Sequence, residues 1–320
     1  MSVEGAQVIN IGVIGVGYLG QHHARIFSEL EGVNLAAVID TDLRRAEEMA
    51  TKYGAKAFVD HRDALRSVNA LSIAAPTTLH HRIALDCIRA GKDILIEKPI
   101  AVTIEEADEI IRESDNNGVI VQVGHLERFN PAVQAVFPLI KHPVFFEAQR
   151  LSPFLGRGID VDITLDLMIH DIDIILAILA HSGALPAVRD IKASVAKVLT
   201  PKIDEARAWF EFENGAQALM IASRLSFEKS RRLKIFQDDA FLLVDYQGME
   251  IKRFSNENGK IIDETIPVAK HEPLKEELRD FIDCIAKRRR PLVSASDGRT
   301  ALKIAMMIGE KIPVVEKKKG

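Results

Sequence analysis

The sequence contains few residues that form covalent cross-links or bind metals through sulfur. It has only two cysteines, Cys87 and Cys284, which lie far apart in segments with helical patterns. Secreted proteins held by disulfides and zinc proteins built on cysteine clusters carry more cysteines at closer spacing. We therefore expect two buried, reduced thiols, no disulfide and no metal site, and thiol catalysis is disfavoured.

Long hydrophobic runs and a large excess of one charge are absent as well. The longest apolar runs, such as residues 172–180, are far shorter than the roughly 20 residues that cross a bilayer, so we expect no membrane contact. A net charge of -4 at pH 7 gives no overall attraction to nucleic acid. The first residues, MSVEGAQVINIGVIG, lack the regions of a signal peptide, which predicts a cytoplasmic protein.

The 320 residues, 47% of them hydrophobic, suffice for two domains. Up to Gly124, short β-branched runs alternate with helical patterns, which predicts an α/β Rossmann domain with a doubly wound parallel sheet over residues 1–124. The predicted strands are residues 8–15, 33–40, 56–60, 70–76, 93–98 and 119–124.

Residues 125–320 have a different pattern, in which a mostly apolar helix with a polar stripe precedes long alternating strands. Tight turns at Asn214-Gly215, Gln247-Gly248 and Asn258-Gly259 are of the positive-φ kind that closes antiparallel hairpins. We expect an α+β domain with a large, mainly antiparallel open sheet. Its two C-terminal helical segments either complete this domain or pack on the first. The predicted strands are residues 143–151, 188–199, 205–213, 216–226, 231–237, 240–246 and 249–255.

The segment IGVIGVGYLGQHHARIF predicts a phosphate-binding loop. Gly15, Gly17 and Gly20 have the G-x-G-x-x-G spacing at the end of a strand and the start of a helix. Glycine at these positions permits a tight turn, close approach of a pyrophosphate and close helix-to-strand packing. Tyr18 and Leu19 lie within the same loop and are expected beside the cofactor.

An acidic residue follows at the distance that dinucleotide-binding folds require. Asp40 ends the next strand, about 20 residues after the glycines. Its carboxylate would accept hydrogen bonds from ribose hydroxyls and repel a 2'-phosphate, so NAD is favoured over NADP. Asp42 adds to this acidic bias, whereas Arg44 and Arg45 weaken it. The alternative is that the glycines serve only a turn and Asp40 caps the next helix.

Reacting groups are expected beyond the carboxyl ends of the strands, where open parallel sheets bind ligands. Glu97 and Lys98 follow one buried strand directly, in LIEKPI. A partly desolvated lysine there can hold a substrate hydroxyl and stabilise alkoxide charge. The alternative, a solvated loop lysine paired with Glu97, is not excluded by these residues.

The segment LDLMIHDIDIILAILA, residues 165–180, reads as a buried helix with a polar stripe. At 100° per residue, Asp166, His170 and Asp173 share one line. Buried charges need partners, so such a stripe faces water, pairs internally or lines a binding cavity. Asp166 and His170 at i, i+4 can hydrogen-bond, while Asp173 either orients the imidazole or pairs with backbone. Asp171 lies off the stripe and is expected to be structural.

Four segments together resemble the Gfo/Idh/MocA family of glucose-fructose oxidoreductases and inositol dehydrogenases. They are GVIGVGYLGQHHAR, IAAPTTLHHRIALDCIRAGKDILIEKPIAVTIEEAD, VQVGHLERFNPAV and LDLMIHDIDI, and the similarity spans nearly the whole chain. Its most specific elements are E-K-P and the later D-x-x-x-H. The resemblance implies that Lys98, Asp166 and His170 meet beside the nicotinamide as the catalytic residues, and that Pro76, His80, Glu97 and Lys98 adjoin the cofactor.

The same resemblance implies a nucleotide-sugar substrate. GHLERFNPA is similar to the matching stretch of dehydrogenases that oxidise C3 of UDP-N-acetylglucosamine or its uronic acid. The stretch from SPF to DLMIHDIDI is similar to the UDP-N-acetylglucosamine enzymes that supply the 3-amino sugar of some lipid A molecules. The product would pass to an aminotransferase. The family's glycine-rich run is replaced here by FLGRGIDVDITLD, which leaves the substrate loop in doubt. A free polyol such as inositol, another nucleotide sugar, or a non-catalytic NAD-binding sensor or scaffold are the alternatives.

Several polar residues are candidates for the substrate half of the site. Arg128 and Asn130 are expected near the nicotinamide and the sugar; alternatively Arg128 ties the domains together and Asn130 begins a helix. Arg150, Arg157 and Arg224 either bind the pyrophosphate or are surface arginines. In this family the open face of the antiparallel sheet makes the subunit contact, so a homodimer or homotetramer is expected.

Overall fold

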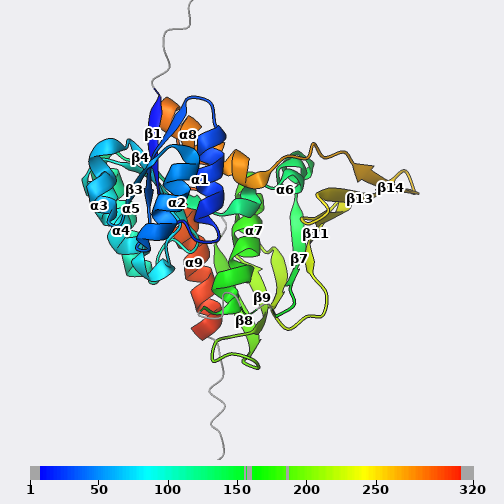
Figure 1. Cartoon of the computed structure of the whole chain (residues 1–320). Coiled ribbons are helices and arrows are strands. Elements are labelled where there is room, and N and C mark those ends of the chain that lie inside the picture. Colours follow the sequence, from blue (N-terminus) through cyan, green and yellow to red (C-terminus); the bar gives the residue numbers. More distant parts are fainter. Residues whose placement is uncertain (1–7, 155, 157–160, 185–186, 311–320) are drawn as a thin grey trace, which may run out of the picture. The chain divides into compact units, whose positions relative to one another are not determined.

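The computed structural model describes residues 8–154, 156, 161–184 and 187–310 (Figure 1). The chain divides into two compact units. The first unit contains Met1–Leu126 and Glu272–Arg299, and the second contains Glu127–His271 and Thr300–Gly320. The division therefore falls two residues beyond the predicted one. Of the two C-terminal helices, α8 (Pro273–Lys287) returns to the first unit, and α9 (Ala295–Glu310) runs from the first unit into the second.

The first unit is built on a six-stranded parallel sheet of order β3-β2-β1-β4-β5-β6, as predicted. From β1 the chain adds strands outward to β3 on one side, and it then continues with β4 to β6 on the other side. Doubly wound folds bind ligands at this change of direction, between β1 and β4. The strands are β1 (Ile9–Ile14), β2 (Val33–Ile39), β3 (Lys56–Phe58), β4 (Ala70–Ile73), β5 (Asp93–Glu97) and β6 (Val121–Gly124).

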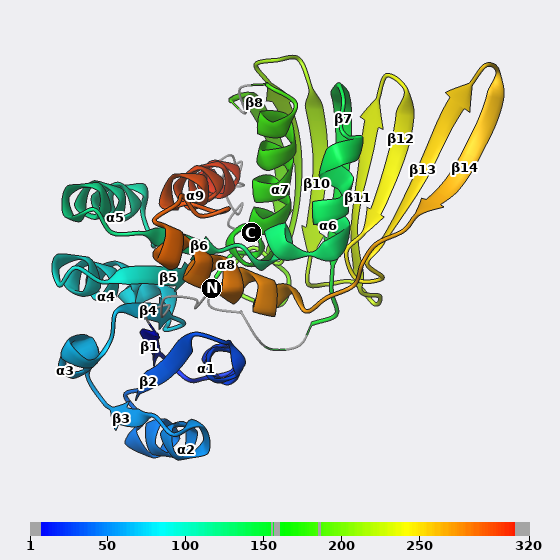
Figure 2. The ribbon, with the colours of Figure 1, turned by 90° about the horizontal axis from the view of Figure 1, so that it is seen from above.

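Helices cover both faces of this sheet (Figure 2). One face carries α1 (Gly20–Glu29), α2 (Leu43–Tyr53) and α8, and the other carries α3 (His61–Ala64), α4 (Thr77–Arg89) and α5 (Ile104–Asn117). The spacing of Leu274, Leu278 and Phe281 places all three on one side of α8. They are buried in the core beside Phe27 of α1, which explains why α8 belongs to the first unit.

The second unit contains an eight-stranded sheet of order β14-β13-β12-β11-β7-β10-β9-β8. It is mainly antiparallel, as predicted, but β7 is inserted at its centre and pairs parallel with β10. The strand β14 was missed by the sequence analysis. The strands are β7 (Pro143–Leu151), β8 (Val188–Ala196), β9 (Glu205–Phe212), β10 (Gln217–Ser223), β11 (Ser230–Gln237), β12 (Ala240–Asp245), β13 (Glu250–Glu257) and β14 (Lys260–Ile266).

Two of the three predicted turns have the expected backbone conformation. Gly215 has a φ of 87°, and Asn258 and Gly259 have φ values of 55° and 83°. At the third turn the positive φ, 53°, falls on Met249 instead of Gly248. The Asp245 side chain accepts hydrogen bonds from the backbone N–H groups of residues 247 and 248, and the left-handed residue follows these bonded amides.

The predicted helix with the polar stripe, in the second unit, is not one continuous α-helix. A π-helical turn, Thr164–Met168, precedes α7 (Ile169–His181). Figure 2 shows α7 and the short α6 (Pro131–Val136) on one face of the second sheet. Because the π turn has i→i+5 hydrogen bonds, the predicted 100° spacing does not apply between Asp166 and His170.

Cys87 and Cys284 are buried free thiols, as predicted. Burial raises the pKa of each thiol to about 12, so neither is a reactive thiolate near neutral pH. None of the helices in the described part of the chain has the length and apolar character of a membrane span.

Candidate active site

The glycine loop after β1 packs so closely that two of its glycines have no room for a side chain. A Cβ on Gly15, whose φ is 82°, would lie 2.8 Å from the Ala74 carbonyl oxygen at the end of β4. A Cβ on Gly20 would lie 1.8 Å from the Gly15 carbonyl oxygen. Gly17 differs, because its Cβ would meet nothing within 4 Å among the described residues. Gly17 therefore exposes bare backbone that a pyrophosphate can approach.

The helix that follows this loop has an N-terminus suited to an anion. α1 begins at Gly20, and no described side chain caps it or places an acid in its first turn. The N–H groups of Gln21 and His22 already donate to the carbonyl oxygens of Gly17 and Leu19. The positive end of the helix dipole is therefore the main attraction for a phosphate at this helix end. Tyr18 is 70% exposed and Leu19 is half-buried in the turn before the helix.

Asp40 ties the end of β2 to the glycine loop. Its Oδ2 accepts a hydrogen bond from the Val16 N–H at 3.0 Å, and its Oδ1 accepts from the Asp42 N–H at 2.9 Å. Arg45 Nη1 lies 3.3 Å from Oδ2. The N-cap of α2 is Asp42, whose side chain accepts from the following backbone amides. The alternative in which Asp40 is the helix cap is therefore wrong.

His80 connects the two loops that follow β4 and β5. Its ring nitrogens lie 2.8 Å from the Ala75 carbonyl oxygen and 2.9 Å from the Pro99 carbonyl oxygen. Burial lowers the pKa of His80, and a neutral imidazole can donate to only one carbonyl at a time. The buried ring therefore lies against both loops but hydrogen-bonds to only one of them at a time. Pro76, at the start of α4, is exposed.

Lys98 follows β5 and is half-buried, and its peptide bond to Pro99 is cis. The preceding carboxylate points into the unit, because Glu97 is only 7% exposed and its Oε1 lies 3.3 Å from Nε2 of His23. Sequence reasoning missed His23. His23 has the helical spacing of the buried residues Ile26 and Phe27 on α1. That spacing could have predicted a buried histidine.

In the second unit, Asp166 lies in the π turn and His170 in the first turn of α7, and both are half-buried. π turns interrupt α-helices frequently at functional sites. The third member of the predicted stripe has a different partner from those considered, because Arg128 Nη1 donates to Asp173 Oδ1 at 3.2 Å. Both of these side chains are buried.

Asn130 has the structural role of the helix-start alternative. Its Oδ1 accepts from the Ala132 N–H and caps α6, which begins with Pro131. Its Nδ2 donates to Glu127 and to the carbonyl oxygen of Tyr246. With these bonds and 4% exposure, the amide has its hydrogen-bonding capacity used within the second unit.

The expectation that Arg150 and Arg224 bind pyrophosphate or lie on the surface is wrong. Arg150 is 1% exposed, bonds Asp171 at 3.0 and 2.9 Å, and bonds Glu127 at 2.7 Å. Arg224 is 4% exposed and donates to the Val161 carbonyl oxygen. Strand alternation explains both positions, since these arginines continue the buried, helix-facing rows of β7 and β10. Arg157 lies outside the described residues.

Arg231 is another charged residue that the sequence analysis did not identify. It pairs with Arg150 across β7 and β11, lies 3.3 Å from Glu127, and has a side chain that is 36% exposed. Burial and the positive charge of Arg150 lower the pKa of Arg231, while Asp166 is among the acids that oppose this shift. Arg231 is therefore electrostatically coupled to the π turn. In the sequence, nothing distinguishes Arg231 from the other basic residues of the segment SRRLK, residues 230–234.

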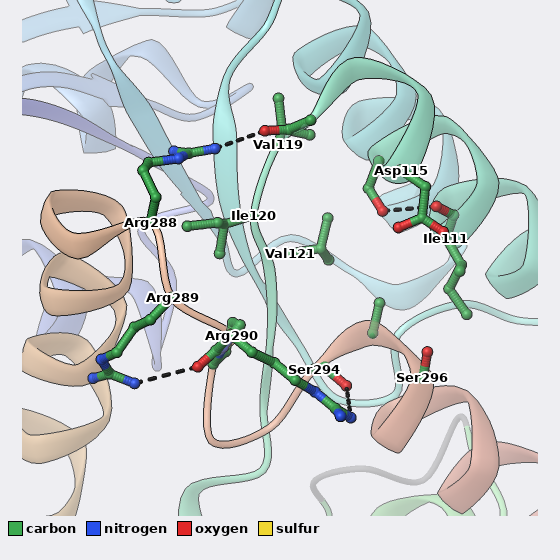
Figure 3. A pocket seen from close by; sticks show the side chains of 14 residues that line it. Ile111, Asp115, Val119, Ile120, Val121, Arg288, Arg289, Arg290, Ser294 and Ser296 are labelled. Atoms are coloured by element: carbon green, nitrogen blue, oxygen red, sulfur yellow. Dashed lines mark hydrogen bonds between the residues drawn. The ribbon is translucent and has the colours of Figure 1, made fainter.

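A hollow of about 660 Å³ in the first unit is lined by three consecutive arginines (Figure 3). Each of them lies within ion-pair distance of a carboxylate, in the pairs Arg288–Asp93, Arg289–Asp280 and Arg290–Asp297. Their charges are thus balanced inside the unit, which makes this hollow a poor anion site. Across the described residues, no cluster of three or more His, Cys, Asp or Glu side chains is placed to hold a metal.

A glycine loop after β1, a carboxylate after β2 and a lysine after β5 are the features of a dinucleotide-binding oxidoreductase unit. A family model described as an oxidoreductase family with an NAD-binding Rossmann fold, GFO_IDH_MocA, matches residues 9–125. UDP-N-acetylglucosamine 3-dehydrogenase from Acidithiobacillus ferrooxidans is 35% identical over 304 residues, covering 93% of this chain and 95% of that protein. The chain belongs to the Gfo/Idh/MocA oxidoreductase family.

Solved structures agree with this assignment. The same A. ferrooxidans enzyme, GnnA, superposes with a TM-score of 0.89 at 34% identity, covering 95% of this chain and 97% of that one. Levoglucosan dehydrogenase in complex with NADH and levoglucosan has a TM-score of 0.83 at 19% identity, which shows the shared fold alone. The scyllo-inositol 2-dehydrogenase (NAD(+)) of Bacillus subtilis is 25% identical over 93% of this chain and 92% of that protein.

The buried ion pairs under α7 lead to a stability prediction. Arg150→Met should lower the free energy of unfolding by about 3–5 kcal/mol, because it leaves Asp171 and Glu127 buried without their main cation. Arg232→Met is the matched control, since Arg232 on the adjoining strand pairs with Asp245 and is 55% exposed in its side chain. It should cost less than about 1 kcal/mol. Urea unfolding measures both values, and equal losses would contradict the prediction.

Proposed function

We propose that this chain oxidises a sugar hydroxyl to a ketone with NAD, most specifically C3 of UDP-N-acetylglucosamine. One observation supports the proposal: a chain with an intact glycine loop also carries Lys98 after β5, Asp166 in the π turn and His170 in the first turn of α7. A protein that only senses NAD has no need of an acid-base pair. The third alternative, a non-catalytic sensor or scaffold, is therefore disfavoured.

The substrate assignment is supported by similarity over the full length. The relative that is 35% identical across nearly the whole chain acts, by its name, on UDP-N-acetylglucosamine. Inositol 2-dehydrogenase of Rubrobacter xylanophilus is 34% identical, but over only 52% of this chain. Oxidation of a free polyol is therefore the second candidate, with the same chemistry. The 3-keto product of the first candidate is a suitable substrate for an aminotransferase.

The reaction needs one proton acceptor and one group that stabilises negative charge. A bound nicotinamide supplies the acceptor for the hydride. His170 takes the hydroxyl proton, and Asp166 in the π turn before it orients the imidazole. Lys98 stabilises the alkoxide charge that develops as the proton leaves, and its partial burial strengthens that interaction.

Asp40 supports NAD over NADP. Its buried carboxylate is fixed by two backbone amides at the end of β2, where the ribose of a dinucleotide lies in this fold. A 2'-phosphate would meet that negative charge at close range. Arg45 offsets the charge only in part, because its side chain is 48% exposed and therefore well screened.

The substrate prediction is tested by NADH formation from UDP-N-acetylglucosamine, its uronic acid and myo-inositol, each with NAD and with NADP. An aminotransferase and glutamate are added to remove a 3-keto product. We expect turnover with UDP-N-acetylglucosamine and NAD, and weaker turnover with NADP. Turnover with myo-inositol alone would transfer the mechanism to the polyol candidate, and no turnover with any of them would contradict the proposal.

The catalytic assignment predicts a loss of rate without a loss of cofactor binding. Lys98→Met and His170→Asn should each lower kcat by about 10²–10⁴-fold, because each removes a group that acts on the transferred proton or its charge. The dissociation constant for NAD should stay near the wild-type value. Lys92→Met, before the same strand, and His181→Asn, at the end of α7, are the controls and should keep kcat. Wild-type rates in the first two variants would refute the assignment.

We also propose that the chain forms a homodimer or homotetramer through the open face of the second sheet. Half-buried aromatic rings cross five of its strands, alternating with the side chains that face α6 and α7. Neighbouring ring centroids are 4.9–5.7 Å apart. The rings belong to Trp209, Phe145, Phe236, Phe241 and Phe254. Such a continuous apolar band on a sheet is typical of a surface that is covered by another chain.

Light scattering during gel filtration tests this assembly. Phe236→Glu, at the centre of the band, should convert the oligomer to a monomer, because the interface would bury an unpaired charge. Leu43→Glu on α2 introduces the same charge at an exposed apolar residue of the first unit and should leave the assembly intact. A monomeric wild-type protein would rule out the proposal.

A further inference from the structure

A series of buried polar side chains lies behind the lysine turn of the first unit. Ser72 of β4 and His23 of α1 are both fully buried, and Ser72 Oγ lies 2.7 Å from His23 Nδ1. His23 Nε2 in turn lies 3.3 Å from Glu97 Oε1. Because α1 starts at the glycine loop and Lys98 follows directly after β5, these contacts join the part of the unit with the glycine loop to the part with the lysine.

The two contacts of the His23 ring differ in kind. Nδ1 and the Ser72 hydroxyl lie at hydrogen-bond distance, and a hydroxyl can either donate to or accept from an imidazole nitrogen. Nε2 lies 3.3 Å from Glu97 Oε1, but the two atoms are not aligned for a hydrogen bond. Ser72 therefore holds the ring, and the ring lies close enough to the carboxylate to limit where it can move.

Gly124 encloses Glu97 from the neighbouring strand. The two residues are paired across β5 and β6. A Cβ at Gly124 would lie 2.8 Å from Oε1 and 3.0 Å from Oε2 of Glu97. Only glycine leaves room for the carboxylate in this position, so the close contact fixes the side chain on one side and His23 fixes it on another.

A second acid adjoins this cluster from α8. Glu277 is fully buried, and neither of its carboxylate oxygens has a hydrogen-bond partner among the described residues. Burial, followed by the charges of Glu97 and Asp280, raises the pKa of Glu277 well above its usual value. Glu277 therefore holds a proton more tightly than an exposed glutamic acid does, and Glu97 is one of the neighbours that cause this.

We propose that His23 is a positioning residue that holds the Glu97 carboxylate and thereby fixes how Lys98 leaves β5. Glu277 of α8 adjoins this carboxylate as a second buried acid. The inference rests on the proposed function for its kinetic consequence, since Lys98 stabilises the alkoxide there. A small displacement of such a group costs rate more than binding.

The kinetic test compares His23→Leu, His23→Gln and a control. His23→Leu should lower kcat by about tenfold or more while the KM for NAD changes little. His23→Gln should restore most of the rate, because its amide can donate to Glu97 and accept from Ser72. His61→Leu is the control: His61 is also buried and bonded to a carboxylate, Asp86, and its loss should lower stability without lowering kcat.

Gly124→Ala displaces the Glu97 carboxylate while leaving His23 in place. It should lower kcat as His23→Leu does, and it provides the test if His23→Leu does not fold. Wild-type kcat in Gly124→Ala, or equal kcat in His23→Leu and His23→Gln, would overturn the positioning role.

Thermal unfolding of Glu277→Gln from roughly pH 5 to 9 tests the cluster without any substrate. Because Glu277 has a raised pKa when folded, the wild-type protein loses stability as pH rises from about 4.5 toward that value. The variant avoids this loss, so its Tm should exceed that of the wild type by a gap that widens with pH. A widening gap in an enzyme inactive on every sugar would support the cluster and reject the proposed function, whereas a constant gap would reject the raised pKa of Glu277 and with it the cluster.

Discussion

The close approach of the β1–α1 turn to the end of β4 is the constraint on which the first unit depends. It exists because Gly15 and Gly20 have no side chain where one would collide with backbone. The same approach leaves Gly17 and the start of α1 open to an anion and brings Val16 within reach of Asp40. Backbone packing and the shape of the cofactor loop therefore have a single cause, and His23 of the same helix lies 3.3 Å from Glu97, the residue before the lysine.

The second unit uses buried charge for a related purpose. Arg150 binds Asp171 and Glu127, and Arg128 binds Asp173, so the acids of α7 that point inward each have a fixed cation. Ion pairs of this kind add little net stability but are costly to break singly. They set the rotation of α7 and leave Asp166 and His170 as the half-buried members of the predicted stripe. In both units, buried polar contacts orient the residues that we assign to catalysis.

Local patterns predicted most of the fold. Alternation between short apolar strands and helices gave the parallel sheet, and glycine spacing with Asp40 gave the phosphate loop, because these signals lie within one βαβ segment. Contacts between distant segments were not predictable. The pairing of β7 with β10, the partners of Arg150, and the contact of His23 with Glu97 all depend on tertiary packing. Arg150 was expected to bind the pyrophosphate or to lie on the surface, because arginine is rarely buried without partners and its partners were not visible in the sequence.

The central claim is that a hydride leaves C3 of a nucleotide sugar for NAD. Transfer of deuterium from specifically labelled UDP-N-acetylglucosamine tests it most directly, with the NADH analysed by mass spectrometry. The account predicts that NADH carries the label when deuterium is at C3 and carries none when it is at C4. Unlabelled NADH from the C3-deuterated sugar, or labelled NADH from the C4-deuterated sugar, would contradict it.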